Sequence, residues 1–227
     1  MIEPDQLAKR FESITSKIGD ATLVAVTKYS DLREISLAYD IGHRDFGENR
    51  VGDLETKANG LQLDERDDVR WHFIGHLQTN KVAKLVKIPN LYAIHSIDSY
   101  KLLQELLRRE SDMLSPVRIY FQVNTSGEAE KGGFEDYESL KKSVSHFYKA
   151  SPSAIIFEGL MTMGTYRTDD RDGEARRCFQ TLKDYAERLK VDFKLDKICL
   201  SMGMSEDFDI ALEEGADVVR VGSLLFK

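Results

Sequence analysis

A lysine directly follows an apolar run near the start of the chain. Val24, Val26 and Lys28 alternate along this run, so in a β-strand their side chains would share one face. At the mouth of a barrel, burial would disfavour the charged form of the amine and favour Lys28 as a nucleophile toward a carbonyl group. The competing interpretation is a solvated lysine at a strand end, because lysine is seldom buried.

Two Gly/Ser-containing segments near the end of the chain have the composition of an anion site. Residues 200–205 (LSMGMS) and 217–223 (DVVRVGS) each predict an apolar strand that runs into a turn. Backbone N–H groups in such turns are unhindered and bind anions. Ser205 precedes two acidic residues, which is typical of a helix N-cap. If these are the last two strands of a parallel barrel, their loops predict a ligand that carries a phosphate.

Closure of a barrel would bring Lys28 next to these turns. The first and last strands would then pair at the usual spacing of about 4.8 Å. A ligand with an aldehyde at one end and a phosphate at the other would fit between the lysine and the turns. Pyridoxal phosphate has this chemistry.

The elements that must position these residues alternate along the chain. Helical spacing of apolar residues predicts a leading helix over about 5–18. Eight strand signals separated by helical patterns favour an α/β fold, a single (β/α)8 TIM barrel with an extra N-terminal helix, over a doubly wound open sheet. We expect one domain over residues 1–227, with no final helix and with the leading helix covering the gap. The strands are predicted near 22–27, 44–47, 69–74, 91–95, 117–123, 154–160, 195–200 and 217–221.

Composition argues against several classes of protein. Charged residues make up 31% and hydrophobic residues 41% of the chain, which is typical of a globular protein. A net charge of −7 disfavours sequence-independent binding to nucleic acid. The N-terminus lacks the pattern of a signal peptide, and no long uncharged apolar run follows. We therefore expect a cytoplasmic protein that does not contact membranes.

No metal site is predicted. The two cysteines, Cys178 and Cys199, lack the spacing of metal ligands. His72 and His76 have helical ligand spacing, but the apolar run around His72 and Gly75 indicate a strand end, where the rings would not converge.

Two further segments could face a ligand. Lys131, followed by two glycines, is either a second anion contact or part of a flexible surface loop. Tyr166 and Arg167 follow the sixth predicted strand and are candidates for closing over the ligand.

A set of short motifs occurs in one order along nearly the whole chain. Together they resemble the pyridoxal phosphate homeostasis protein family, formerly called the proline synthase co-transcribed group, which is similar to the N-terminal domain of bacterial alanine racemase. The resemblance implies a barrel that holds pyridoxal phosphate on a lysine at the end of its first strand. The motifs are Val26-Thr27-Lys28, Phe46-Gly47-Glu48-Asn49, Trp71-His72-Phe73-Ile74-Gly75, Val123-Asn124, Gly159-Leu160-Met161 and the two segments near the end of the chain.

The resemblance implies seven binding residues and no catalytic residue. Lys28 would hold pyridoxal phosphate covalently, and Arg220 would face the pyridine nitrogen. Asn49 and Met161 would line the pocket around the ring. The phosphate ligands implied by the resemblance are Ser201, through its hydroxyl, Gly222 and Ser223.

Arg220 favours a carrier over an enzyme. A guanidinium does not readily give up a proton, so the ring nitrogen beside it would stay unprotonated and the ring would be a poor electron sink. Racemisation also needs an acid/base group on the opposite face of the substrate, which alanine racemase takes from a second domain. We predict a protein that holds and supplies pyridoxal phosphate, intracellular homeostasis of this cofactor, without substantial amino-acid turnover.

Two enzyme classes are the alternatives: an amino-acid racemase-like enzyme that uses pyridoxal phosphate, and a Schiff-base aldolase. The expected partners of a carrier are the cofactor itself and, transiently, the apo forms of enzymes that use it. We expect the protein to be a monomer.

Overall fold

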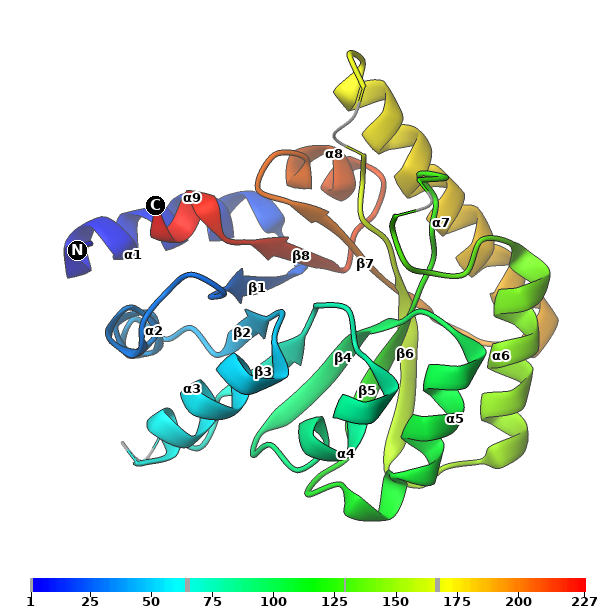
Figure 1. Ribbon diagram of the computed structural model, residues 1–227. Helices are drawn as coiled ribbons and strands as arrows, with labels where there is room; N and C mark the ends of the chain where they lie inside the picture. Colours follow the sequence, from blue (N-terminus) through cyan, green and yellow to red (C-terminus); the bar gives the residue numbers. More distant parts are fainter. Residues whose placement is uncertain (1, 64–65, 129, 166–167) are drawn as a thin grey trace.

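Parallel pairing of the first and last strands closes the sheet into a barrel (Figure 1). The computed structural model describes residues 2–63, 66–128, 130–165 and 168–227. Each strand pairs with its neighbours in chain order, so the predicted (β/α)8 barrel is confirmed and the open sheet is excluded. The strands are β1 (Thr22–Val26), β2 (Asp45–Glu48), β3 (Arg70–Phe73), β4 (Leu91–Ile97), β5 (Val117–Gln122), β6 (Ile155–Met161), β7 (Cys199–Met204) and β8 (Val218–Val221).

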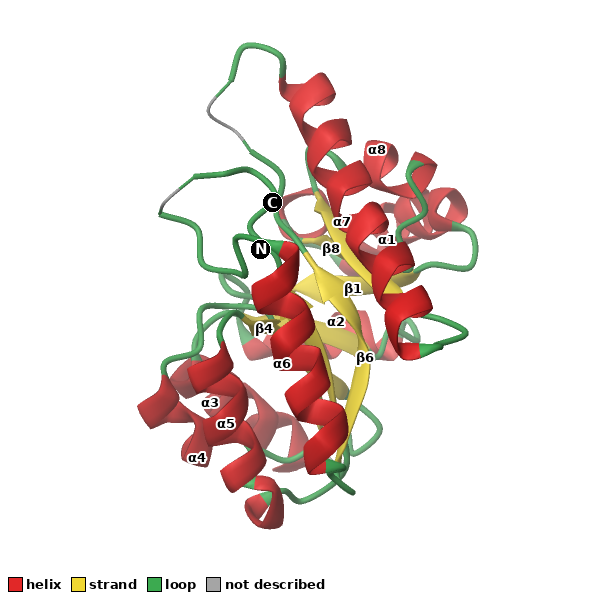
Figure 2. Ribbon diagram, turned by 90° about the vertical axis from the view of Figure 1, so that its right-hand side faces the viewer, coloured by secondary structure: helices red, strands yellow, loops and turns green. Residues whose placement is uncertain are grey.

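Helices follow each strand and surround the barrel (Figure 2). An additional helix precedes β1, as the apolar spacing near the N-terminus predicts. The helices are α1 (Pro4–Ile18), α2 (Leu32–Asp40), α3 (Val51–Leu63), α4 (Val82–Leu85), α5 (Tyr100–Arg108), α6 (Tyr137–Ala150), α7 (Arg171–Phe193), α8 (Phe208–Glu213) and α9 (Ser223–Phe226), with short 3-10 turns at Thr79–Lys81 and Glu110–Asp112.

The expectation of no helix after the last strand is wrong. A single helical turn, α9, forms after Gly222, whose carbonyl accepts the N–H of Leu225 at 3.0 Å. Helix α1 packs beside this turn, and the Arg10 guanidinium donates to the Leu225 carbonyl at 3.1 Å. The rings of Phe11 and Phe226 meet edge to face with centroids 6.0 Å apart. Together α1 and α9 cover the wall of the barrel where the chain begins and ends.

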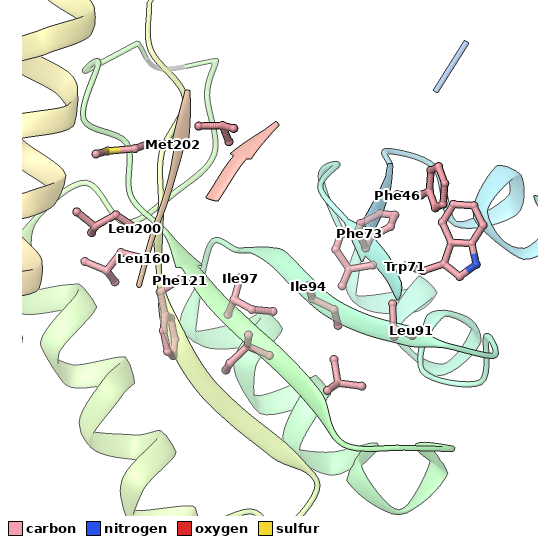
Figure 3. Packing of buried hydrophobic residues seen from close by; sticks show 14 of the residues in the cluster. Phe46, Trp71, Phe73, Leu91, Ile94, Ile97, Phe121, Leu160, Leu200 and Met202 are labelled. Carbon is pink, nitrogen blue, oxygen red and sulfur yellow. The ribbon is translucent and has the colours of Figure 1, made fainter. Parts of the chain in front are cut away.

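Apolar side chains on the outer face of the strands set the register of the sheet. Phe121, Leu160 and Leu200 are register neighbours on β5, β6 and β7 and are buried in the cluster that joins the barrel to its helices (Figure 3). Burying each such side chain contributes about 1.5–3 kcal/mol. A slip by one residue would move all of them to the other face of the sheet. Their burial therefore also decides which residues face the barrel interior.

The barrel interior combines a small apolar cluster with a polar group. Close packing leaves no room for a side chain at Gly47, where a Cβ atom would lie 2.8 Å from Cγ1 of Val24. The apolar cluster consists of Val24, Ala93, Tyr120, Met161 and Val218. The polar residues, all buried, are Asp45, His72, His95, Ser201 and Arg220.

Strand β7 lies four residues later than predicted. Helix α7 extends to Phe193 and ends where Lys194 adopts a left-handed conformation, with φ of 55°. The strand therefore begins at Cys199 and continues through Met204, across residues predicted to form a turn. As a consequence, Ser201 lies within the strand, and the mouth of the barrel is reached only at Ser205.

Candidate functional site

A cavity of about 1080 Å³ opens at the carboxyl ends of the strands. This is the end of a parallel barrel at which ligands bind. The cavity lining includes Lys28, Asn49, Arg220, Gly222 and Ser223, which are five of the seven predicted binding residues. The other two, Met161 and Ser201, are fully buried deeper in the barrel.

Lys28 lies in the turn that follows β1, two residues past the end of the strand. The shared face predicted from the sequence is present: Val24 lies in the interior cluster, while Val26 and Lys28 line the cavity above it. The Lys28 amine lies 5.1 Å from the ring centroid of Tyr29. Its side chain is exposed, so the expected burial is absent and the alternative of an exposed lysine at the strand end holds. The fold places the Lys28 amine at the cavity.

A buried ion pair fixes the turn beneath Lys28. The Lys57 amine donates to Oε1 of Glu48 at 2.6 Å and to the Thr27 carbonyl at 2.7 Å. The Thr27 hydroxyl donates to the same Glu48 oxygen at 2.6 Å. Glu48 and Thr27 are fully buried. The residue directly before Lys28 is therefore held by both its side chain and its carbonyl, and no spacing rule in the sequence indicates this pairing.

Two turns, at the ends of β7 and β8, form the anion-binding side of the cavity. The Gly222 N–H donates to the Ser205 hydroxyl oxygen at 3.2 Å and so joins the turns. A Cβ atom at residue 222 would lie 3.1 Å from the Val26 carbonyl oxygen, so glycine lets this turn pass close to the end of β1. Ser223 begins α9, and the first N–H groups of a helical turn have no partner within it. These donors suit a phosphate.

Ser205 is not the N-cap that the sequence predicts. Asp207 occupies that position for α8, and its carboxylate accepts the Met204 N–H at 2.6 Å. The Ser205 side chain lines the cavity beside Gly222 instead. Ser205 lies in the segment 200–205 that the sequence predicts as part of an anion site, but its neighbours indicated an N-cap and not a phosphate ligand. Its position at the cavity makes its hydroxyl a candidate phosphate ligand.

The Arg220 side chain is buried and forms part of the cavity lining. Its Nη1 donates to the Ser201 hydroxyl oxygen at 2.7 Å, and its Nη2 donates to the Thr162 carbonyl at 2.8 Å. Ser201 is fully buried and does not line the cavity. Its position supports contact with Arg220 and gives no support to the predicted contact with a phosphate.

Met161 also lies below the cavity, fully buried in the apolar cluster of the interior. Met163, two residues later along the chain, lines the cavity. A separation of two residues is the side-chain period of a strand, so Met161 and Met163 lie on the same face, with Met161 at the deeper level of the barrel.

Charge is unevenly distributed around the cavity. On the β7, β8 and β1 side the described lining has three cations, Lys28, Arg220 and Lys227, and two carboxylates, Glu34 and Glu206. On the opposite side of a barrel closed in chain order, after β4 and β5, it has one cation, Lys131, and three carboxylates, Asp98, Glu130 and Glu135. A ligand with one anionic end would therefore be oriented with that end toward β7, β8 and β1.

The Lys131 amine donates to Oε1 of Glu128 at 3.0 Å and to the Gly164 carbonyl at 2.7 Å. Lys131 lines the cavity and links the loops after β5 and β6. Tyr166 and Arg167, the predicted closing residues, lie outside the described residues.

His72 and His76, which have the spacing of metal ligands on a helix, do not converge. His72 is buried in the barrel interior, whereas His76 is exposed and lies 3.0 Å from the Asp98 carboxylate. Within the described ranges, no three His, Cys, Asp or Glu side chains are arranged to hold a metal ion. In the same part of the chain, no helix has both the length and the apolar character needed to cross a bilayer.

Known proteins are similar to this chain over nearly its whole length. The family model "Alanine racemase, N-terminal domain" matches residues 2–227. The chain is 37% identical over 210 residues to the pyridoxal phosphate homeostasis protein of Caenorhabditis elegans, covering 90% of this chain and 84% of that protein. It is 39% identical over 209 residues to the Homo sapiens protein of the same name, covering 90% and 75%. PipY of Synechococcus elongatus, solved with pyridoxal phosphate bound, has a TM-score of 0.86 at 30% identity, covering 98% of this chain and 100% of PipY.

Proposed function

The chain belongs to the family of pyridoxal phosphate homeostasis proteins, and from this premise we propose that it binds pyridoxal phosphate and keeps it available to enzymes that use it. The observation that carries the proposal is the placement of Lys28, Arg220 and the turns at Ser205 and Gly222 around one cavity. An amine, a guanidinium and a set of hydroxyl and N–H donors suit an aldehyde, a ring nitrogen and a phosphate respectively.

Lys28 is proposed as the covalent attachment point. When bound, pyridoxal phosphate would supply an aldehyde, with which the Lys28 amine would form a C=N bond with loss of one water. Ser205, Gly222 and Ser223 are proposed to hold the phosphate, and Asn49 to line the ring pocket. Gly222 lets the turn after β8 lie close to the end of β1, beside Lys28, and this closeness supports the arrangement.

Arg220 is proposed to face the pyridine nitrogen. A guanidinium stays protonated, so it donates to the nitrogen without transferring a proton to it. The ring then withdraws electrons weakly, and the chain's own residues hold the cofactor without activating a bound amino acid. We therefore propose that amino-acid turnover is not the main role of the protein.

The remaining proposals concern organisation and partners. We propose that residues 1–227 act as one domain and as a monomer in the cytoplasm. We also propose that the apo forms of cofactor-dependent enzymes are its transient partners and receive the cofactor from it.

Titration with pyridoxal phosphate, followed by visible absorbance, tests binding, and pyridoxal serves as the control ligand without phosphate. We expect saturable binding of the phosphate form and far weaker binding of pyridoxal. Mixing the loaded protein with an apo-enzyme should then restore that enzyme's activity. Equal affinity for the two ligands would contradict the anion site. Exchange of the α-hydrogen of an L-amino acid in deuterated water at about 1 per second or faster would favour a racemase instead.

A further inference from the structure

A chain of buried polar groups crosses the barrel interior and ends at Arg220. The members come from five strands: Asp45 on β2, His72 on β3, His95 on β4, Ser201 on β7 and Arg220 on β8. We call it the interior polar chain. Successive polar atoms are 3.0 Å apart from Asp45 to His72, 2.9 Å from His72 to His95, 2.8 Å from His95 to Ser201 and 2.7 Å from Ser201 to Arg220.

The two ends determine which atom donates at every step. An ionised carboxylate only accepts, so Nε2 of His72 must donate to Asp45. Nδ1 of a neutral His72 then accepts from Nε2 of His95, and Nδ1 of His95 accepts the hydroxyl proton of Ser201. A guanidinium only donates, so Arg220 donates to the Ser201 oxygen. Every bond therefore points the same way, from the cation at the cavity to the anion in the barrel.

The reverse direction would require a protonated carboxyl at Asp45. Burial favours that form, but hydrogen bonds from Arg70 and His72 outweigh it and hold the pKa of Asp45 well below its usual range. Burial also lowers the pKa of His72 and, further, that of His95, so both rings stay neutral. The titratable and charged groups that face the two rings, besides the rings themselves, are His43, Asp45, Arg70, Tyr92, Arg118, Tyr120 and Arg220.

Ring packing holds the two histidines in the orientations that these bonds need. The His95 ring stacks on Tyr120 with centroids 4.3 Å apart and an interplanar angle of 13°. The His72 ring contacts His95 and Tyr92 at centroid distances of 5.2 and 5.3 Å. The Ser201 hydroxyl therefore donates its proton to His95, and its oxygen accepts from Arg220.

We propose that His72 and His95 are positioning residues that act through Ser201 to hold Arg220 in the orientation in which it meets the pyridine ring. The part that concerns the ring rests on the proposed function. The direction of the hydrogen bonds does not, because it follows from the side chains alone. Neither histidine lines the cavity.

Nitrogen-detected NMR of the protein with ¹⁵N-labelled histidine, without added cofactor, tests the direction. We expect both rings as neutral Nε2–H tautomers that do not titrate between about pH 6 and 8. Spectra of His72→Phe and His95→Phe would assign the signals. An Nδ1–H tautomer in either ring, or titration near the ordinary histidine pKa of about 6.5, would overturn the proposal.

Cofactor binding tests the link to Arg220. Ser201→Ala and His95→Phe, which keeps a ring beside Tyr120, should each weaken binding of pyridoxal phosphate by about tenfold or more and shift the absorption maximum of the bound cofactor. His146→Phe is the matched control, because His146 contacts Tyr100 on the outer helices. Unchanged affinity and spectrum in the first two variants would overturn the proposal. Failure of the unmodified protein to bind would refute the proposed function instead and leave the NMR result standing.

Discussion

Lys57→Met should destabilise the protein strongly, because Lys57 neutralises a carboxylate that has no access to water. Glu48 is fully buried, and its Oε2 has no hydrogen-bond partner within the described residues. Its Oε1 accepts from Lys57 and from Thr27. Removing the amine would leave a buried charge with one neutral donor, which costs about 3–5 kcal/mol in the free energy of unfolding. For a chain of this size that corresponds to a melting temperature lower by about 6–20 °C.

A more exposed ion pair with the same N–O distance is the control. The Lys84 amine lies 2.6 Å from the Glu55 carboxylate, and about half of the Lys84 side chain is exposed. Lys84→Met should therefore cost no more than about 1 kcal/mol. Thermal and urea unfolding, followed by circular dichroism, measure both variants. The double variant Lys57→Met with Glu48→Gln removes the buried charge and should recover part of the loss. A cost for Lys57→Met no larger than that for Lys84→Met would refute this reasoning.

Two further predictions concern the anion site and pH. Ser205→Ala should weaken binding of pyridoxal phosphate by about tenfold and change pyridoxal binding little, whereas Ser201→Ala should weaken both ligands alike; titrations that show the same pattern for the two variants would speak against separate roles. Because burial lowers the folded-state pKa of His72 and His95, their stabilising effect is complete above about pH 6.5 and is lost as the pH falls below that value, by up to about 1.4 kcal/mol per pH unit for each ring. Urea unfolding between pH 5 and 7.5 measures this slope, and stability that rises toward pH 5 would be inconsistent with neutral buried rings.

The alternation of strand and helix signals was sufficient to predict the barrel, because apolar strand residues face the helices along most of the sheet. β7 was the exception. Residues 200–205 contain Ser and Gly, which favour turns in isolation, yet Leu200 and Met202 alternate toward the outer core while Ser201 faces inward. Tertiary burial thus outweighed local turn propensity. The length of α7, which displaced the strand, is not marked by a glycine or proline at its end.

Motifs identified the strands that carry the site but not every side chain that reaches the cavity. Lys28 and Arg220 line the cavity as predicted, because each follows a clear alternation along its strand. Met163 and Ser205 also line it but were not among the predicted binding residues, because their level in the barrel depends on where β6 and β7 end. The interior polar chain could not be predicted at all, since its bonds join strands whose spatial order and stagger are set only when the barrel closes.

Mapping the attachment point of the cofactor tests whether Lys28 is the residue that holds it. The unmodified protein would be loaded with pyridoxal phosphate, reduced with borohydride, digested and analysed by peptide mass spectrometry. We predict a single modified peptide, with the pyridoxyl group on Lys28. Lys227 is the natural competitor, because its amine lies 5.2 Å from the ring centroid of Tyr29, the same ring that Lys28 contacts. A modification on Lys227 or Lys131, or no modification at all, would contradict the assignment of Lys28 as the residue that holds the cofactor.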